Sequence, residues 1–107
     1  MSQAPVSVSN WNACFGASSD VLALSCRVTS EEGKTSIEAV GMLLNDGEGR
    51  TIASMYVELS EETSLASPAL NVPPGDLKLG DTVTMVVQGE ADGQHFFFEQ
   101  NLTIGSC

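Results

Sequence analysis

Residues 37–59 read IEAVGMLLNDGEGRTIASMYVEL, and this stretch decides the fold class. Apolar residues recur at every second position on both sides of the central NDGEG, a period typical of β-strands. An Asp-Gly pair followed by a second glycine supplies the positive φ angles that tight hairpins need. The sequence therefore predicts two antiparallel strands, residues 36–44 and 51–59. The first of them is apolar on both faces near its end, so we expect it to be central.

The same alternation extends outward in both directions, and no segment of ten or more residues has the apolar spacing of a helix. The other expected strands cover residues 6–15 with a bulge at Asn10, 21–29, a short edge segment to Val72 interrupted by Pro68, 82–88, and 94–104. The expected connections are residues 16–20, 30–35, 60–63 and 89–93. This pattern predicts an all-β, two-sheet antiparallel sandwich of about seven strands, forming a single domain over residues 1–107.

One turn adds an architectural resemblance. Residues 77–81 form a Leu-x-Leu-Gly-Asp turn that feeds a penultimate strand, and this strand pairs with a final aromatic one. In this outline the chain resembles immunoglobulin-like and fibronectin type III domains. The Cys, Trp, Cys pattern of antibody domains is absent, because the sole tryptophan, Trp11, precedes Cys26. The resemblance implies the sandwich and does not select a function.

The charge of the chain limits its partners. Fourteen acidic residues outnumber four basic ones, giving a net charge of -10 over 107 residues. The bases are scattered along the chain: Arg27, Lys34, Arg50 and Lys78. Nucleic acids and anionic membranes would therefore repel the protein, and the apolar run near residues 39–44 is far shorter than the ~20 residues of a spanning helix. We expect a soluble protein that binds no nucleic acid and no membrane.

The cysteines bear on the compartment. Cys14, Cys26 and Cys107 are an odd number, which fits a reducing environment, and residues 1–19 lack the features of a signal peptide. We expect a cytoplasmic protein; the alternative is a secreted or periplasmic one whose signal peptide has been removed. If a disulfide forms, we expect it between Cys26 and Cys107. The pairing of Cys14 with Cys26 is less favoured, because the expected strand register sets Cys26 nearer to Trp11 than to Cys14.

Few residues could support catalysis or metal binding. The three cysteines and His95 contain no close pair of the kind that zinc sites use. A cysteine nucleophile needs a base, for which His95 is the sole candidate, and the first two cysteines fall on or near a buried face. The acidic turns at residues 45–48 and 90–92 offer oxygen ligands without the converging carboxylates of a calcium loop. We expect no enzymatic activity, no metal and no cofactor.

Exposed aromatic residues give the clearest functional signal. Residues 96–98 are all phenylalanine, so if the first and third enter the core, Phe97 points outward. An exposed aromatic side chain is a typical anchor in binding interfaces, and Tyr56 raises the same question on its own strand. The candidate interaction surface consists of Tyr56, His95, Phe97 and Glu99.

Three functions are compatible with these observations. The first is a non-catalytic binding module that recognises a protein or glycan partner through an exposed sheet face or loops. The alternative is a structural subunit of a homo-oligomer or particle, suggested by the doubly apolar strand and by sheet edges free to pair. The third is a small acidic inhibitor or immunity-type protein, whose charge would steer it to a basic enzyme at a rate that falls with salt.

Overall fold

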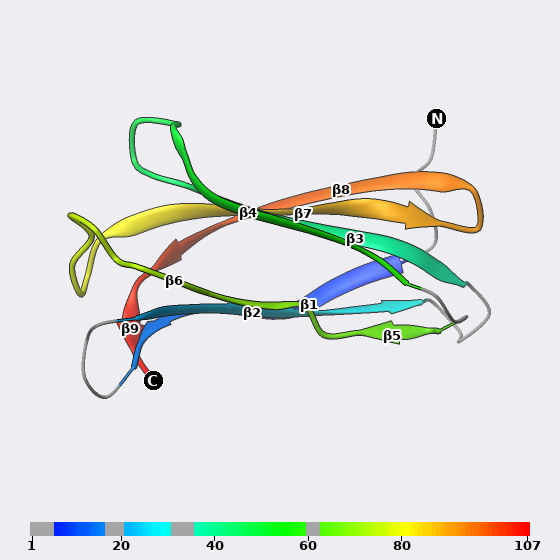
Figure 1. Cartoon of the computed structure of the whole chain (residues 1–107), viewed down its shortest axis with the longest axis horizontal. Coiled ribbons are helices and arrows are strands. Elements are labelled where there is room, and N and C mark those ends of the chain that lie inside the picture. Colours follow the sequence, from blue (N-terminus) through cyan, green and yellow to red (C-terminus); the bar gives the residue numbers. More distant parts are fainter. Residues whose placement is uncertain (1–5, 17–20, 31–35, 60–62) are drawn as a thin grey trace.

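Two sheets face each other in the computed structural model, which describes residues 6–16, 21–30, 36–59 and 63–107 (Figure 1). The strands are β1 (Val6–Phe15), β2 (Leu22–Ser30), β3 (Ile37–Asn45), β4 (Thr51–Glu58), β5 (Leu65–Ala66), β6 (Ala69–Val72), β7 (Thr82–Ala91), β8 (Gln94–Thr103) and β9 (Gly105–Ser106). One sheet has the strand order β5-β2-β1-β9, and β6 pairs with β2 in the same sheet. The other sheet has the strand order β4-β3-β7-β8. The predicted all-β sandwich is confirmed. Within the described residues, no helix is suited to crossing a membrane.

The predicted β3–β4 hairpin is confirmed, and its tip is held by one carboxylate. Asp46 Oδ1 accepts hydrogen bonds from the backbone N–H groups of Glu48 and Arg50 at 2.9 and 3.0 Å, and Asp46 Oδ2 pairs with Arg50 Nε at 3.0 Å. The backbone hydrogen bond from Arg50 is the main reason that the pKa of Asp46 lies below its usual value. Gly49 adopts a φ of 83°, which a side chain would disfavour.

Two irregularities were also predicted correctly. The register of β1 against β2 shifts between Ser9 and Asn12, and Asn10 has a φ of 54°. Pro68 separates β5 from β6, and both of these short strands pair with β2 at the edge of the sheet. Of the predicted connections at residues 16–20, 30–35 and 60–63, residues 17–20, 31–35 and 60–62 lie outside the described residues, and Ser30 is the last residue of β2.

The predicted turn at residues 89–93 is wrong, because β7 continues to Ala91 and the turn consists of Asp92 and Gly93 alone. Both turn residues have positive φ angles, 50° and 73°, as a two-residue hairpin requires. Gly89 is therefore a strand residue. It fits there because its missing side chain leaves room for the Phe96 ring and the Ala39 carbonyl.

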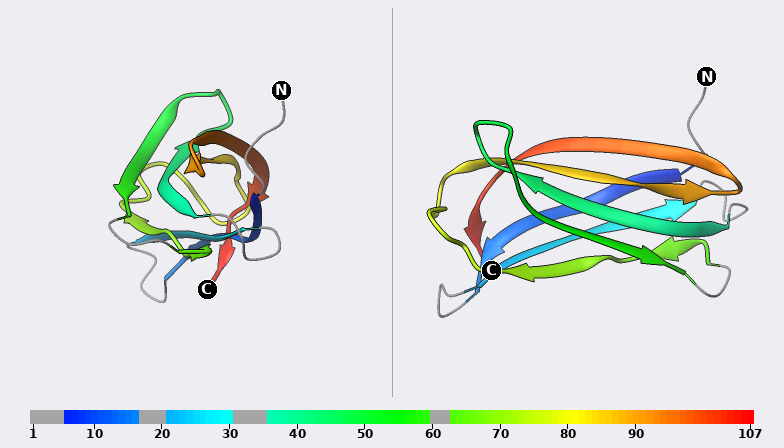
Figure 2. Two further views of the ribbon diagram at one scale, coloured as in Figure 1. Left: turned by 90° about the vertical axis from the view of Figure 1, so that its right-hand side faces the viewer. Right: turned by 45° about the horizontal axis from the view of Figure 1, so that its top comes forward.

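The core lies between the sheets, and Figure 2 (left) shows the strands enclosing it when viewed along the long axis of the domain. Each sheet contributes the alternate residues of its central strands, as the period of two predicts. The largest fully buried side chains are Phe96, Leu22, Leu24, Ile37, Met42, Leu44, Met85 and Ile104. The predicted burial of β3 on both faces is confirmed: Met42 and Leu44 join the core, whereas Ala39 is buried but lies outside the core cluster.

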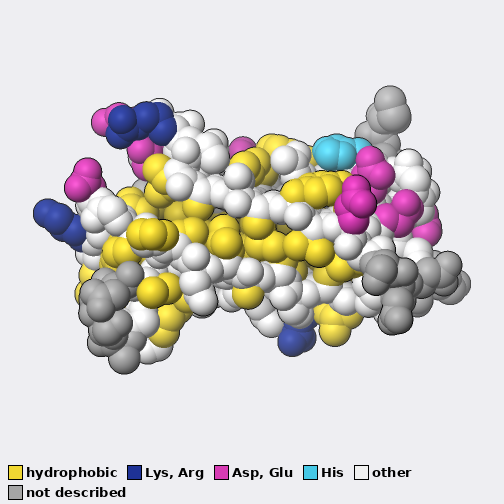
Figure 3. All heavy atoms as spheres, in the orientation of Figure 1, with side chains coloured by type: hydrophobic (Ala, Val, Ile, Leu, Met, Phe, Trp, Pro, Cys, Tyr) yellow, Lys and Arg dark blue, Asp and Glu magenta, His cyan; other side chains and the backbone are white. Residues whose placement is uncertain are grey.

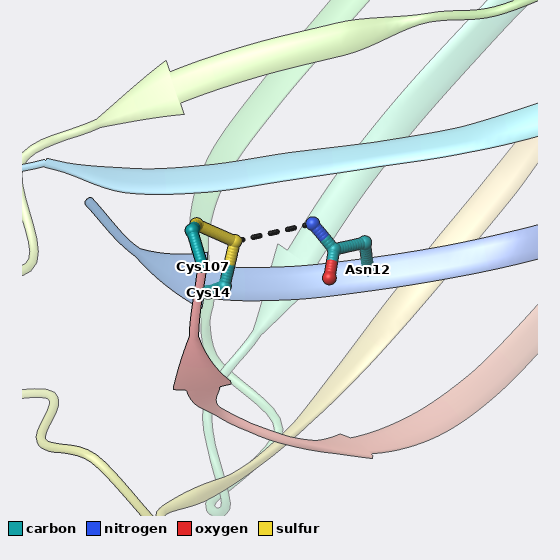
Figure 4. The surroundings of a disulfide bond; sticks show 3 residues. All are labelled: Asn12, Cys14 and Cys107. Carbon is teal, nitrogen blue, oxygen red and sulfur yellow. Dashed lines mark hydrogen bonds between the residues drawn. A yellow bond between two sulfur atoms is a disulfide. The ribbon is translucent and has the colours of Figure 1, made fainter. Parts of the chain in front are cut away.

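The disulfide joins Cys14 to Cys107, so the prediction that favoured Cys26 with Cys107 is wrong (Figure 4). After Ile104 the chain leaves the β8 sheet and pairs as β9, in parallel, with the end of β1. This crossing places the Cα atoms of Cys14 and Cys107 5.1 Å apart. Asn12 Nδ2 donates a hydrogen bond to Cys14 Sγ at 3.2 Å. Cys26 remains a free thiol in the core.

Candidate binding face

The outer face of the β4-β3-β7-β8 sheet carries a row of four residues, one from each strand. The register pairs Tyr56 with Gly41, Gly41 with Gln88, and Gln88 with Phe97. Neighbouring strands are about 4.8 Å apart, so Tyr56 and Phe97 emerge about 14 Å from each other. The two aromatic side chains therefore mark the two sides of the sheet face.

Beside Tyr56 the sheet is low and apolar, and Gln88 is the polar residue between Gly41 and Phe97. A Cβ at Gly41 would lie 3.2 Å from Cδ2 of Tyr56, which shows that the tyrosine ring leans over the glycine. Ala39 and Val86 point outward in neighbouring rows and are still only 4% exposed each. A glycine flanked by small buried side chains thus forms the floor, and the aromatic rings rise on either side.

Polar side chains surround this floor. Register places Glu99 opposite Val86, and His95 opposite Glu90, on the same face as Phe97. At the far edge, Glu58 follows Tyr56 on β4 and faces outward with it. An apolar floor with carboxylates and amides at its margin offers both stacking surfaces and hydrogen-bond partners to a ligand.

The structure brings the four sequence-predicted site residues to this one face. Tyr56 comes from β4 and is 60% exposed, and Phe97 comes from β8 and is 46% exposed. His95 and Glu99 flank Phe97 on β8 and are also exposed. The sequence reasoning missed Gly41 and the other floor residues, because only the register across four strands shows which of them lie between the aromatics.

A second feature is the seam where the edges of the two sheets meet. A hollow of 490 Å³ lies between β4 and the β5–β6 edge; it is lined by Val40, Met55, Val57, Leu59, Thr63, Leu65, Ala66, Ser67 and Pro68. Another hollow of 490 Å³ at the opposite end of β4 includes Thr51, Ile52 and Val72. Figure 3 shows hydrophobic side chains forming a band over β4 and toward β6.

The described residues offer little for catalysis or metal binding. Cys14 and Cys107 are consumed by the disulfide, and burial raises the pKa of the Cys26 thiol to about 12, so a thiolate there is strongly disfavoured at neutral pH. Within the ranges that the structure describes, no three His, Cys, Asp or Glu side chains gather where they could hold a metal ion.

Comparison with known proteins identifies the fold class. No protein-family model and no curated protein matches the sequence. Among solved structures, a β-glucuronidase from Parabacteroides merdae superposes over 94% of this chain with a TM-score of 0.67 and 11% identity. A DUF3823 family protein from Bacteroides ovatus also superposes over 94% of this chain, with a TM-score of 0.60 and 13% identity. OgpA from Akkermansia muciniphila superposes over 95% with a TM-score of 0.60 and 11% identity.

These likenesses show a shared β-sandwich fold. The chain spans only 14% of the β-glucuronidase, 55% of the DUF3823 protein and 29% of OgpA. In each of these proteins the sandwich is thus one part of a longer chain.

Proposed function

We propose that this chain is a non-catalytic binding module that recognises a protein or glycan partner through the outer face of the β4-β3-β7-β8 sheet. The observation that carries the proposal is the cross-strand row in which Tyr56 and Phe97 stand on either side of Gly41 and Gln88. The two aromatic side chains leave backbone positions about 14 Å apart, so a ligand that contacts both of them has to extend across the sheet.

The similar structures support a modular role and suggest probes. They include β-glucuronidases from Parabacteroides merdae, Bifidobacterium dentium and Bacteroides uniformis, and a catalytically inactive OgpA was solved in complex with an O-glycopeptide substrate. Because the identity is only 11% to 17%, their ligands do not transfer to this chain. Glucuronides and O-glycopeptides are nevertheless the first glycans to test beside protein partners.

Replacing Phe97 by Ser should weaken partner binding at least 10-fold while lowering the free energy of unfolding by only about 1 kcal/mol. An aromatic anchor in an interface typically contributes 2 kcal/mol or more, that is, about 30-fold in affinity, whereas burial of about half of the ring is worth about 1 kcal/mol to the fold. Binding would be measured on glucuronide and O-glycopeptide arrays and by pull-down with identification of the captured proteins.

Leu79→Ser is the matched control for this substitution. Leu79 is also a large exposed hydrophobic residue, 64% accessible, but it lies in the connection between β6 and β7, away from the sheet face. We expect this variant to bind like the unmodified protein. Equal losses in both variants, or a Phe97→Ser protein that fails to fold, would contradict the proposed face.

The disulfide supports the alternative compartment, and we propose that the module functions in an oxidising environment outside the cytoplasm. Structural disulfides persist in such compartments and are rare in reducing ones. The odd cysteine count, which favoured the cytoplasm, has a structural explanation: Cys26 is only 4% exposed and packs in the core as a small hydrophobic residue.

Thiol counting tests this proposal. Protein isolated without reductant should show no reactive thiol when folded, one thiol after unfolding, and three after unfolding with reductant. Three reactive thiols without reductant would contradict the disulfide.

The Cys26 thiol, with its pKa raised to about 12 by burial, also makes stability depend on pH. The unfolded chain loses this proton from about pH 9 upward and the folded chain does not, so the free energy of unfolding should fall as pH rises from 9 to 12.

A further inference from the structure

The sheet edge formed by β4 lacks the features that protect sheet edges from pairing with other chains. The β5–β6 edge consists of strands of two and four residues separated at Pro68, β9 is two residues long, and β8 lies against β1. β4 is eight residues long, and β3 is the one strand that pairs with it in the described part of the chain. From Ala53 to Val57 it contains no charge and no proline, whereas exposed edges usually carry one or the other.

The free backbone groups of β4 can be assigned. The N–H of Leu59 donates to the carbonyl of Glu38 at 2.8 Å, so Leu59 faces β3. The β3–β4 register is regular from Ala53 to Glu58, and backbone groups alternate in direction along a strand. The N–H and C=O groups of Ser54 and Tyr56 therefore point away from β3, toward the open edge.

Exposed apolar side chains concentrate at the same edge. Among the residues that the structure describes, seven large hydrophobic side chains are exposed, and four of them belong to β4 or face it across the seam: Ile52 at 46%, Tyr56 at 60%, Val57 at 42% and Leu65 at 47%. The hollows at both ends of β4 show that the seam is open along this strand. An additional strand beside β4 would cover the apolar band that Figure 3 shows.

We propose that β4 is a homodimer interface, at which the β4 strands of two copies pair antiparallel about a two-fold axis centred on Met55. A two-fold axis perpendicular to the sheet keeps inner residues opposite inner residues. In this register Met55 faces Met55 of the second copy, Ala53 faces Val57, and Ser54 faces Tyr56. Each larger side chain outside the centre meets a small one, and residues 53–57 bring no like charges together.

The pairing satisfies the free backbone groups and covers the seam. Ser54 and Tyr56 of each copy exchange hydrogen bonds, about four in all, because each hydrogen-bonded pair of an antiparallel ladder makes two. The inner-face side chains of the second strand, Ala53 and Val57, extend the sheet over the seam hollow beside Leu65. The two four-stranded sheets then form one continuous eight-stranded sheet.

Cross-linking tests the register directly. In the proposed dimer Met55 forms a non-hydrogen-bonded pair with its own copy, with a Cα separation of about 4.5 Å, within the range that a disulfide bridges. Met55→Cys should therefore give a covalent dimer on mild oxidation. Ser54→Cys is the matched control, because its counterpart lies diagonally about 7 Å away or more and should not cross-link. Cross-linking of both variants, or of neither, would overturn the register.

The native mass tests the dimer itself. Sedimentation or light scattering of the unmodified protein should show a species of twice 11.2 kDa at high micromolar concentration, and the dimer should strengthen with salt, because each copy carries a charge of -10. Ser54→Pro removes an N–H that points to the partner and none that points to β3, and Ser54→Lys adds a charge at the edge. Each should weaken dimerisation at least 10-fold.

Three outcomes separate this proposal from the others. A Thr103→Lys variant, which places the same charge on β8, should dimerise normally, as should Phe97→Ser, since neither residue lies on β4. A mass of 11.2 kDa up to millimolar concentration would overturn the proposal, as would a dimer that survives both substitutions at Ser54. Because the edge and the outer face are tested by different variants, failure of one proposal leaves the other standing.

Discussion

Replacing Cys107 by Ser is expected to lower the free energy of unfolding by about 4 kcal/mol. The disulfide spans a sequence separation of 93 residues, and closing a loop of this size restricts the unfolded chain by an amount worth roughly 4–5 kcal/mol in the chain-entropy model. In the folded state the bond fixes β9, which pairs with β1 over only two residues and is held further by a hydrogen bond from the Cys107 N–H to the Phe15 carbonyl at 3.0 Å.

Denaturant unfolding with and without reductant measures this effect. Reductant should destabilise the unmodified protein by the same amount as the substitution and should leave the Cys107→Ser variant unchanged. The choice of cysteine matters: Cys107 is exposed, so serine is accommodated there, whereas Cys14 is 5% exposed and a serine would bury a hydroxyl. If reductant destabilises the variant further, another disulfide contributes.

The strands were predictable because their signals are local. Alternation and turn chemistry located β1 to β4 within one or two residues, and the proline at position 68 correctly identified a broken edge strand. The same local reasoning placed Phe97 and Tyr56 on an exposed face, since Phe96 enters the core and its neighbour on the strand must point the other way.

The errors arose where distant contacts decide the conformation. The sequence around Gly105 gives no sign that the chain leaves one sheet and joins the other, so the partner of Cys107 was assigned to β2 instead of β1. Gly89 was assigned to a turn because glycine is frequent in turns. Its actual role depends on the close approach of two groups that are distant in sequence, the Ala39 carbonyl of β3 and the Phe96 ring.

The candidate site shows the same division. Exposure of each aromatic residue followed from its own strand, whereas the floor between them depends on the pairing of four strands. Gly41 lies opposite both Tyr56 and Gln88 only in the observed register. A shift of one residue would turn the side chains of that strand to the other face, so the row could not be derived before the register was known.

Gly89→Ala is expected to lower the free energy of unfolding by about 3 kcal/mol or more, and the unfolding temperature by about 12 °C or more. A Cβ at this position would overlap the backbone carbonyl of Ala39 and would lie 2.8 Å from Cζ of Phe96. The Phe96 ring could shift, but the carbonyl belongs to the central strand β3 and is fixed by its pairing with β7. The two strands must therefore separate locally to admit one methyl group.

A double variant distinguishes the two contacts. If the carbonyl dominates, Gly89→Ala should destabilise the Phe96→Leu variant as much as it destabilises the unmodified protein, because the smaller side chain makes room only on the ring side. Gly105→Ala is the matched control: its Cβ would meet no atom within 4 Å, so its stability should change by no more than about 0.5 kcal/mol. A smaller cost of Gly89→Ala in the Phe96→Leu variant would instead assign the glycine requirement to the Phe96 ring.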